Sequence, residues 1–160
     1  MKSMSPVVRT ITAFLFAPIL IFGIYIIVHG HLTPGGGFQG GAIIATLMAL
    51  WFVAMGNTKW KKKLLSGMES SGLLVFIIFA FLGLLATGGF FFNNFFAGDG
   101  FFLFGESIWD GVGAHPNSAP LMSGGTVPVM NMAVGLEVVA GLTLIVITIG
   151  LFAFEGKEGE

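Results

Sequence analysis

Residues 29–41 read His-Gly-His-Leu-Thr-Pro-Gly-Gly-Gly-Phe-Gln-Gly-Gly, and apolar runs lie on both sides of this glycine motif. Six of the 25 glycines and two of the three histidines fall within it. The flanking runs are long enough to enter a bilayer, so the irregular backbone between them lies at or inside the membrane edge. Exposed peptide groups there cost several kcal/mol each. We therefore expect the motif to face protein, not lipid.

The composition indicates an integral membrane protein. The 160 residues are 55% hydrophobic and 9% charged, whereas soluble domains are about 25% charged. The net charge of −1 gives no indication of a nucleic-acid partner. Because the chain has no cysteine, disulfides, thiol chemistry and cysteine-held zinc or iron–sulfur clusters are excluded. No metal cluster, nucleophile–base set or cofactor fingerprint stands out, so we expect no cofactor and no independent enzyme.

Hydropathy predicts an all-α fold, a single membrane domain over 1–160 with four transmembrane helices. A span needs about 20 apolar residues, and the second helix must begin inside the glycine motif to reach that length. We expect the first span to be retained and not cleaved as a signal peptide, and to be kinked at Pro18. The predicted spans are 10–28, 37–55, 73–92 and 129–154, with a long outer segment at 93–128.

Aromatic runs on either side of Asp99-Gly100 give the outer segment its own pattern. Asp-Gly between such runs is typical of a short β-hairpin. The same aromatic residues also fit an interfacial belt at the level of the lipid headgroups. Both interpretations are open.

Basic residues predict the orientation, because Lys and Arg are retained on the cytoplasmic side during insertion. With four spans, Lys2, Arg9, the cluster at 59–63 and Lys157 all fall on one side of the membrane. The opposite side, with the glycine motif and residues 93–128, contains no Lys or Arg. We therefore predict a multi-pass protein of the cell membrane with both termini in the cytoplasm.

Glu137 is the one acid well inside a predicted span. Ionisable residues at such depth usually face the protein interior and mark ion or proton paths. Ala133 and Gly141 lie on the same helical stripe and let another helix approach the acid closely. An ion pathway and a packing role are both open for Glu137. Asn131, nearer the outer surface, is predicted to form a helix-end or interhelical hydrogen bond.

The glycine motif has two interpretations. Pro34 presets a turn, Gly35 permits positive φ, and the pairs Gly36/Gly40 and Gly37/Gly41 have the spacing of close helix contacts. One interpretation is close packing. The other is a broken-helix ion site, in which carbonyl groups at the end of the first span attract a cation. Histidine side chains in general can gain and lose a proton near neutral pH, so His29 and His31 are candidates for a proton relay or for ordinary interfacial histidines.

Glu69 precedes the third predicted span. An acid in the first turn of a helix complements the positive end of the helix dipole, so we predict a capping role. Pairing with the lysines at 61–63 is compatible with that role.

Residues 31–41, preceded by Gly30 and followed by an apolar helix, resemble the signature of the B subunit of Mrp-type multisubunit sodium/proton antiporters, MnhB or MrpB. The size, the four-span layout and an acid at the place of Glu137 extend the resemblance over nearly the whole chain. The phenylalanine-rich outer segment and residues 134–138 look closer to versions found in archaeal membrane-bound hydrogenase-type respiratory complexes. The resemblance implies a small non-catalytic subunit in a hetero-oligomer of Mrp-like membrane subunits, and it implies that Pro34 and Phe38 matter to function.

Two functional hypotheses follow from these features. In the first, the chain contributes to sodium ion translocation coupled to proton movement, either in a free antiporter or in a hydrogenase-type complex. In the second, it is a scaffold that seals or positions neighbouring subunits and carries no ion.

Overall fold

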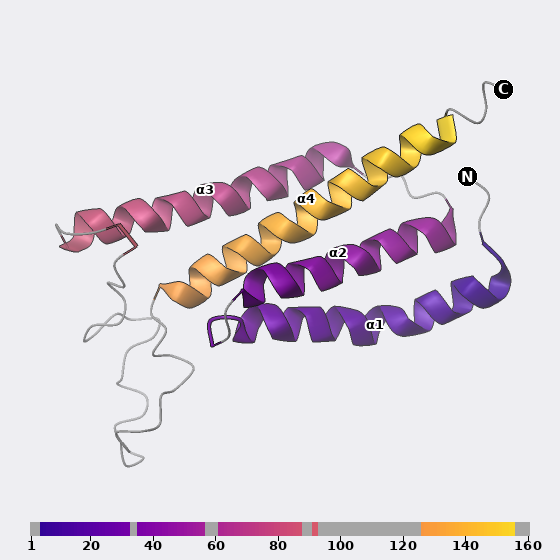
Figure 1. The fold of residues 1–160 in the computed structure, drawn as a ribbon, viewed down its shortest axis with the longest axis horizontal. Coiled ribbons are helices and arrows are strands. Elements are labelled where there is room, and N and C mark those ends of the chain that lie inside the picture. The colour runs from indigo at the N-terminus through magenta and orange to yellow at the C-terminus, as the bar shows by residue number, and fades with distance from the viewer. Residues whose placement is uncertain (1–3, 33–34, 57–60, 88–90, 93–125, 156–160) are drawn as a thin grey trace, which may run out of the picture.

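Four long helices make up the chain in the computed structural model, which describes residues 4–32, 35–56, 61–87, 91–92 and 126–155 (Figure 1). Each of the four is long and apolar enough to cross a membrane. No strand occurs in the described residues, and the prediction of a four-span, all-α membrane protein is confirmed. Residues 93–125 of the outer segment lie outside the described residues, and so does the proposed β-hairpin. The helices are α1 (Pro6–His29), α2 (Gly36–Met55), α3 (Lys62–Thr87) and α4 (Val127–Glu155).

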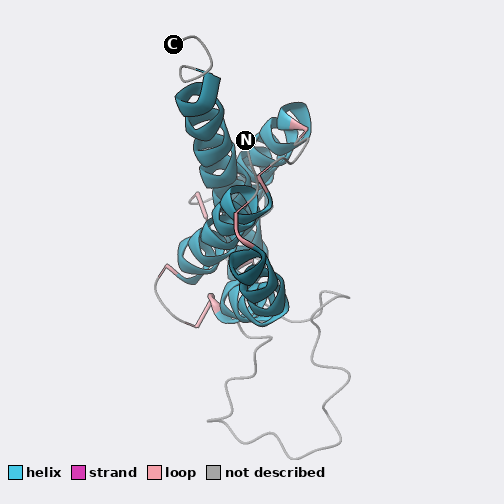
Figure 2. Cartoon of the chain, turned by 90° about the vertical axis from the view of Figure 1, so that its right-hand side faces the viewer, coloured by secondary structure: helices cyan, strands magenta, loops and turns pink. Residues whose placement is uncertain are grey.

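The helices follow one another across the molecule in the order α3, α4, α2, α1 (Figure 1). α2 packs against α1 and α4, and α4 packs against α3 and, over a smaller area, α1. Seen after a quarter turn, the helices cross one another and do not run strictly parallel (Figure 2). The two central helices, α2 and α4, therefore hold the outer two in place.

Glycines set the distance between α1 and α2. A Cβ atom on Gly40 would lie 2.7 Å from the carbonyl oxygen of Gly23, and one on Gly23 would lie 2.5 Å from the Ile44 side chain. Helices in a membrane associate by close van der Waals packing, and small residues allow their backbones to approach. α1 and α2 therefore pack closely where Gly23 faces the first turns of α2.

A buried apolar cluster lies where three helices meet at the opposite end. Phe52 of α2, Leu65 of α3 and Ile147 of α4 form it. The Phe52 ring fits because α4 has Gly150 there: a Cβ atom at that position would lie 2.7 Å from the ring. This cluster joins the ends of α2, α3 and α4, which are far from the glycine motif.

The third helix differs from its predicted span of 73–92 at both ends. It begins at Lys62, because long basic side chains extend their apolar stems along a helix and leave the charge in water. It ends at Thr87, just before the pair Gly88-Gly89, which disfavours a helix. Phe91 and Phe92 then lie back against α3, with ring centroids 5.3 Å from Phe81 and 5.6 Å from Phe76, respectively.

The capping role predicted for Glu69 is wrong. Because α3 starts at Lys62, its first turn contains no acid, and Glu69 lies two turns inside the helix. None of the described lysines at 61–63 forms an ion pair with it. The remaining bounds are close to those predicted, although α1 starts four residues early, at Pro6, a residue type favoured in the first helical turn.

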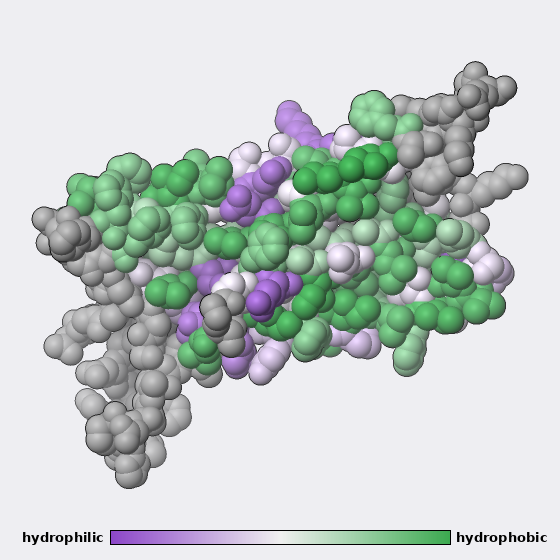
Figure 3. Space-filling model, in the orientation of Figure 1, coloured by the Kyte–Doolittle hydropathy of each residue, from purple (hydrophilic) through white to green (hydrophobic). Residues whose placement is uncertain are grey.

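Apolar side chains cover the outer surfaces of α1 and α3. Phe14, Ile21 and Leu85 are 78%, 67% and 77% exposed, respectively. The face seen in Figure 3 is largely hydrophobic, with hydrophilic patches over α3 and near the connection of α1 to α2. A surface of this kind fits lipid or other membrane subunits, not water.

Candidate functional site

The glycine motif forms a sharp break between α1 and α2. α1 ends at His29 and α2 begins at Gly36, after Gly35 has turned the chain with a φ of +82°. Gly30 and Gly36 face each other across the break so closely that a Cβ atom on Gly36 would overlap the Cα atom of Gly30. Only glycine fits such an approach, which explains why the turn is built from this residue.

The two glycine pairs of the motif contact different helices. Gly36 and Gly40 face α1, at Gly30 and at Gly23 with Ile27. Gly37 and Gly41 instead face α4: Cβ atoms there would lie 2.5 Å from the Asn131 carbonyl oxygen and 3.0 Å from the Gly135 carbonyl oxygen, respectively. The first turns of α2 therefore pack against α1 on one side and α4 on the other.

Asn131 of α4 joins all three helices at the break. Its Oδ1 accepts a hydrogen bond from the Gly37 backbone N–H at 2.7 Å, and its Nδ2 donates to the Ile27 carbonyl oxygen at 2.5 Å. One side-chain amide therefore satisfies a free donor at the start of α2 and an acceptor near the end of α1, the groups that helix termini leave unpaired. The predicted interhelical hydrogen bond of Asn131 is confirmed.

The carbonyl groups at the end of α1 already have protein partners. Besides Asn131, the Gly30 N–H lies 3.3 Å from the Ile27 oxygen, and the Leu32 N–H donates to the His29 oxygen at 3.0 Å. His31 Nδ1 lies 3.1 Å from the Val28 oxygen and donates to it in the Nδ1-protonated tautomer. Carbonyl groups occupied in this way attract a cation less than free ones.

His29 and His31 are separated by one residue in sequence but have different surroundings. The His29 ring stacks on Tyr25, with centroids 4.3 Å apart. Nδ1 of His29 and Nε2 of His31 are buried without a hydrogen-bond partner among the described residues. Gly30, between the two histidines, lies against the Asn131 side chain, and Asn131 precedes Glu137 by six residues, or about 9 Å along α4. The described contacts do not join them to Glu137.

The structure describes one of the two motif residues that the resemblance singles out, Phe38, but not the other, Pro34. Phe38 points away from the helix contacts and is 57% exposed. Pro34 lies outside the described residues. Their predicted importance stays a prediction.

Glu137 lies in the contact between α3 and α4, which we call the acidic seam and define by Glu69, Gly72, Glu137 and Gly141. A Cβ atom on Gly72 would lie 2.7 Å from the Ala133 carbonyl oxygen and 3.0 Å from the Glu137 Cβ. The missing side chain of Gly72 thus lets α3 lie directly against the turn that contains Glu137, which is half-buried. Ala133 and Gly141 belong to this contact, as their shared stripe predicts.

Glu69 is the second acid of the seam. A Cβ atom on Gly141 would lie 3.3 Å from a Glu69 carboxylate oxygen. Since α3 and α4 run antiparallel, Glu69 pairs in register with Gly141 and Gly72 with Glu137, so the two acids are offset by about one helical turn, roughly 6 Å along the axis. Sequence analysis missed this role, although Leu65, Glu69, Gly72 and Phe76 repeat at helical spacing and mark one face.

Thr143, also on α4, buries a hydroxyl group with no partner among the described residues. Its side chain is 1% exposed. Sequence analysis did not single it out, because a threonine in an apolar helix usually bonds to the carbonyl group one turn earlier and carries no other signal.

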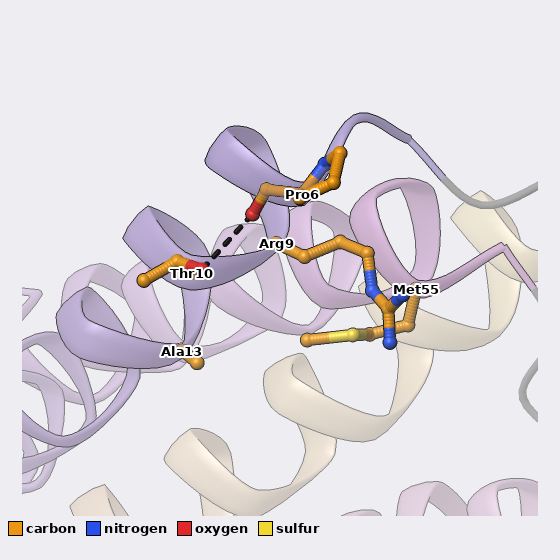
Figure 4. A pocket seen from close by; sticks show the side chains of 5 residues that line it. All are labelled: Pro6, Arg9, Thr10, Ala13 and Met55. Carbon is orange, nitrogen blue, oxygen red and sulfur yellow. Dashed lines mark hydrogen bonds between the residues drawn. The ribbon is translucent and has the colours of Figure 1, made fainter.

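A separate open hollow lies at the far end of the α1–α2 hairpin (Figure 4). None of the residues predicted to form a site lines it. Thr10 Oγ1 donates to the Pro6 carbonyl oxygen at 3.0 Å within it. Its lining residues are Pro6, Arg9, Thr10, Ala13 and Met55.

The glycine motif and the acidic seam both lie within the part of the chain that matches a known protein family. Residues 7–144 match the family described as "Domain related to MnhB subunit of Na+/H+ antiporter". The chain belongs to this family. The match includes α1 from its second residue, the glycine motif, all of α2, and α4 as far as residue 144, which contains both Asn131 and Glu137.

Relatives of this MnhB-family chain come from archaea and bacteria. It is 32% identical to an uncharacterised protein of Methanocaldococcus jannaschii over 87% of this chain and 50% of that protein. It is 43% identical to the putative antiporter subunit mnhB2 of Staphylococcus aureus strain Newman over 34% of this chain and 38% of that protein. The chain therefore spans half or less of the length of these relatives.

A solved structure shares the fold of this MnhB-family chain. It is a chain of the membrane-bound sulfane sulfur reductase, an archaeal respiratory membrane complex, with a TM-score of 0.67 and 36% sequence identity. The match covers 91% of this chain and 57% of the other. Together with the four apolar helices, these relatives make the protein a multi-pass membrane protein of a family that includes antiporter and respiratory-complex subunits.

Proposed function

We propose that the chain is a membrane subunit of a multisubunit cation/proton antiporter module and contributes to sodium ion translocation coupled to proton movement. Membership of the MnhB family supports this proposal. The related chain in an archaeal respiratory membrane complex supports two settings, a free antiporter or a redox-driven complex. In either setting the partners are other membrane subunits, and the chain itself carries out no catalysis.

The acidic seam is our candidate for the part of the ion pathway in this subunit. The observation that carries it is the placement of Glu69 and Glu137, both half-buried, on one helix contact at membrane depth. A carboxylate at this depth is costly to bury, and neither acid has a described cationic partner that would offset the cost. Such groups are suited to exchange protons or to bind a sodium ion.

The glycine motif has a different part in this proposal. The occupied carbonyl groups at the end of α1 and the close contacts of its glycines support packing over a broken-helix ion site. His29 and His31 stay candidates for a proton relay at the outer end, because each has one buried ring nitrogen without a described partner. That relay is a weaker part of the proposal than the seam.

A scaffold without ion transport is the second candidate function. The Asn131 hydrogen bonds favour it, because they use the polar groups at the break for structure alone. On this hypothesis Glu69 and Glu137 would only position neighbouring subunits.

Glu137→Gln separates the two functions. Glutamine keeps the shape and the hydrogen-bonding capacity of the side chain but does not titrate. If the seam conducts, the assembled complex should form at parental levels and lose much of its sodium-dependent antiport or sodium-stimulated turnover, measured in membrane vesicles. Parental transport across the working pH range would leave the scaffold as the better hypothesis.

We also propose that both termini are cytoplasmic. The start of α1, the end of α2, the start of α3 and the end of α4 lie at the same end of the molecule (Figure 1), and Arg9 and the lysines at 61–63 are there. Single cysteines at Lys62 and at Ser118, which is outside the described residues, should react with an impermeant thiol reagent from opposite sides. Labelling of both from outside would contradict the orientation.

A further inference from the structure

The open hollow between the start of α1 and the end of α2 contains an arginine without a described counter-charge. We call it the Arg9 hollow; its volume is about 360 Å³, and its lining residues are those drawn in Figure 4. The Arg9 side chain extends from α1 across to Met55 of α2 (Figure 4). Its guanidinium group is exposed and forms no hydrogen bond or ion pair with any described residue. This charge is therefore open to an anion from outside the described chain.

The backbone at the end of α2 does not use the donors of Arg9. The last four carbonyl groups of a helix have no partner within the helix, and two of those in α2 have found other donors. The Gly56 N–H donates to the Phe52 oxygen, and the Met4 N–H donates to the Ala54 oxygen, each at 3.2 Å. The negative end of the α2 dipole favours a cation here. The five N–H donors of the guanidinium group nevertheless lack a described acceptor.

Apart from Arg9, the hollow offers apolar surface. Its other lining side chains are a proline, an alanine, a methionine and Thr10. Thr10 Oγ1 donates its proton to the Pro6 carbonyl oxygen at 3.0 Å, so the hydroxyl group is already bonded within α1. About one turn further along both helices, Phe16 and Trp51 meet edge to face, with ring centroids 4.9 Å apart. The hollow is thus a short apolar gap with one positive charge at its mouth.

Arg9 lies at the level of lipid headgroups. α1 has 24 residues, whereas about 20 are enough to cross the hydrocarbon, and Arg9 is the fourth residue of the helix. Val7 and Ile11 on the same part of α1 are 66% and 52% exposed, which fits contact with lipid. The lysines at 61–63 add positive charge at the same end of the molecule (Figure 1). Basic pockets between transmembrane helices bind anionic headgroups at this level.

We propose that the Arg9 hollow binds an anionic phospholipid, whose phosphate group pairs with the Arg9 guanidinium and whose first chain carbons fill the apolar gap. A free phosphate ion would use the charge but not the apolar walls. A zwitterionic lipid would bring its own cation close to Arg9. The hollow is remote from the acidic seam, so the proposal does not rest on ion transport there.

The charge is tested by titrating the purified full chain in detergent with phosphatidylglycerol and following binding by native mass spectrometry. Arg9→Gln should weaken binding by about fivefold, the size expected for one basic residue at a membrane surface. Arg9→Lys should restore most of the affinity.

Lys62→Gln is the matched control, because it removes the same charge from the same end of the molecule but not from the hollow. It should weaken binding by less than about twofold, since salt screens charges outside the hollow. Equal weakening by Arg9→Gln and Lys62→Gln, or none by Arg9→Gln, would overturn the proposal.

The class of ligand is tested with phosphatidylcholine and with inorganic phosphate. Phosphatidylcholine should bind the parent about fivefold more weakly than phosphatidylglycerol and should not depend on Arg9. Inorganic phosphate should not displace bound phosphatidylglycerol. Equal binding of the two lipids would refute the proposal, and displacement by phosphate would make the hollow a site for the free ion.

The apolar gap is tested with Ala13→Leu, which narrows the hollow. Ala17→Leu is its control, because Ala17 is exposed on the same helix but does not line the hollow. Both alanines are exposed, so thermal unfolding of either variant should match that of the parent. Ala13→Leu should weaken phosphatidylglycerol binding, whereas Ala17→Leu should leave it unchanged. Parental binding by both variants would show that the lipid does not enter the hollow.

Discussion

The break between α1 and α2 and the acidic seam between α3 and α4 both depend on glycines for close helix contact. They differ in whether their polar groups have hydrogen-bond or ionic partners. At the break, Asn131 and neighbouring N–H groups form hydrogen bonds with backbone groups at the ends of both helices, although His29 Nδ1 and His31 Nε2 are buried there without a partner among the described residues. At the seam, Gly72 and Gly141 bring two helices together around carboxylates with no described partner of opposite charge. Satisfied polar groups fix a structure, whereas unsatisfied acids at membrane depth are available for a ligand, a proton or another subunit.

The largest expected effect is at the break. A Cβ atom on Gly37 would lie 2.5 Å from the Asn131 backbone oxygen, so Gly37→Leu must push α2 and α4 apart. We expect a loss of about 3 kcal/mol in stability, seen as low abundance and thermal unfolding at a lower temperature in detergent. Gly67→Leu, at an open site, is the control and should unfold like the parent. Equal unfolding of both variants would show that the break is not tightly packed.

The next effect should come from the amide of Asn131. Asn131→Leu leaves the Gly37 N–H and the Ile27 carbonyl oxygen without this partner, at an expected cost of about 1–3 kcal/mol. Asn131→Asp separates the two bonds, because a carboxylate still accepts from Gly37 but no longer donates to Ile27. The parent should have the highest midpoint temperature of thermal unfolding, and both variants should unfold at lower temperatures. A parental midpoint for Asn131→Leu would mean that water or another group replaces the amide.

At the seam, stability and activity should separate. Glu69→Gln keeps the contact with Gly141 and removes one titrating group, so we expect unfolding within about 0.5 kcal/mol of the parent and reduced cation-dependent transport in vesicles. The reduction should be smaller than that of Glu137→Gln if Glu137 is the principal group. A variant that lost stability but kept transport would make Glu69 a packing residue like those at the break.

The smallest effect on transport is expected from Gly141→Ala. Its added methyl group would lie 3.3 Å from the Glu69 carboxylate, a contact that the flexible glutamate can relieve by a small shift. We expect a change in stability below about 1 kcal/mol together with a measurable change in cation dependence of transport. Gly72→Ala, which would meet the Ala133 backbone oxygen at 2.7 Å, is the comparison and should be more destabilising. If Gly141→Ala destabilised the protein more than Gly72→Ala, the tighter helix contact would be at Gly141.

The sequence alone determined the membrane class, the number of spans, the family resemblance and the start of the second helix inside the glycine motif. These features depend on hydropathy, length and local backbone freedom, which a short window of sequence contains. It also determined that Glu137 lies on a stripe with small residues, because helical spacing is a local property. The single membrane domain over 1–160 stays a prediction.

Tertiary structure decided which helix each residue meets. Gly36 and Gly37 are neighbours in sequence, but one faces α1 and the other α4; no local pattern distinguishes them. The sequence predicted that Glu69 caps the third helix, but α3 begins at Lys62. The antiparallel register of α3 and α4 instead places Glu69 against Gly141. Contacts between residues 94 and 104 positions apart, as in the two Asn131 hydrogen bonds, depend on how whole helices cross, and that crossing is set by packing summed over entire helix faces.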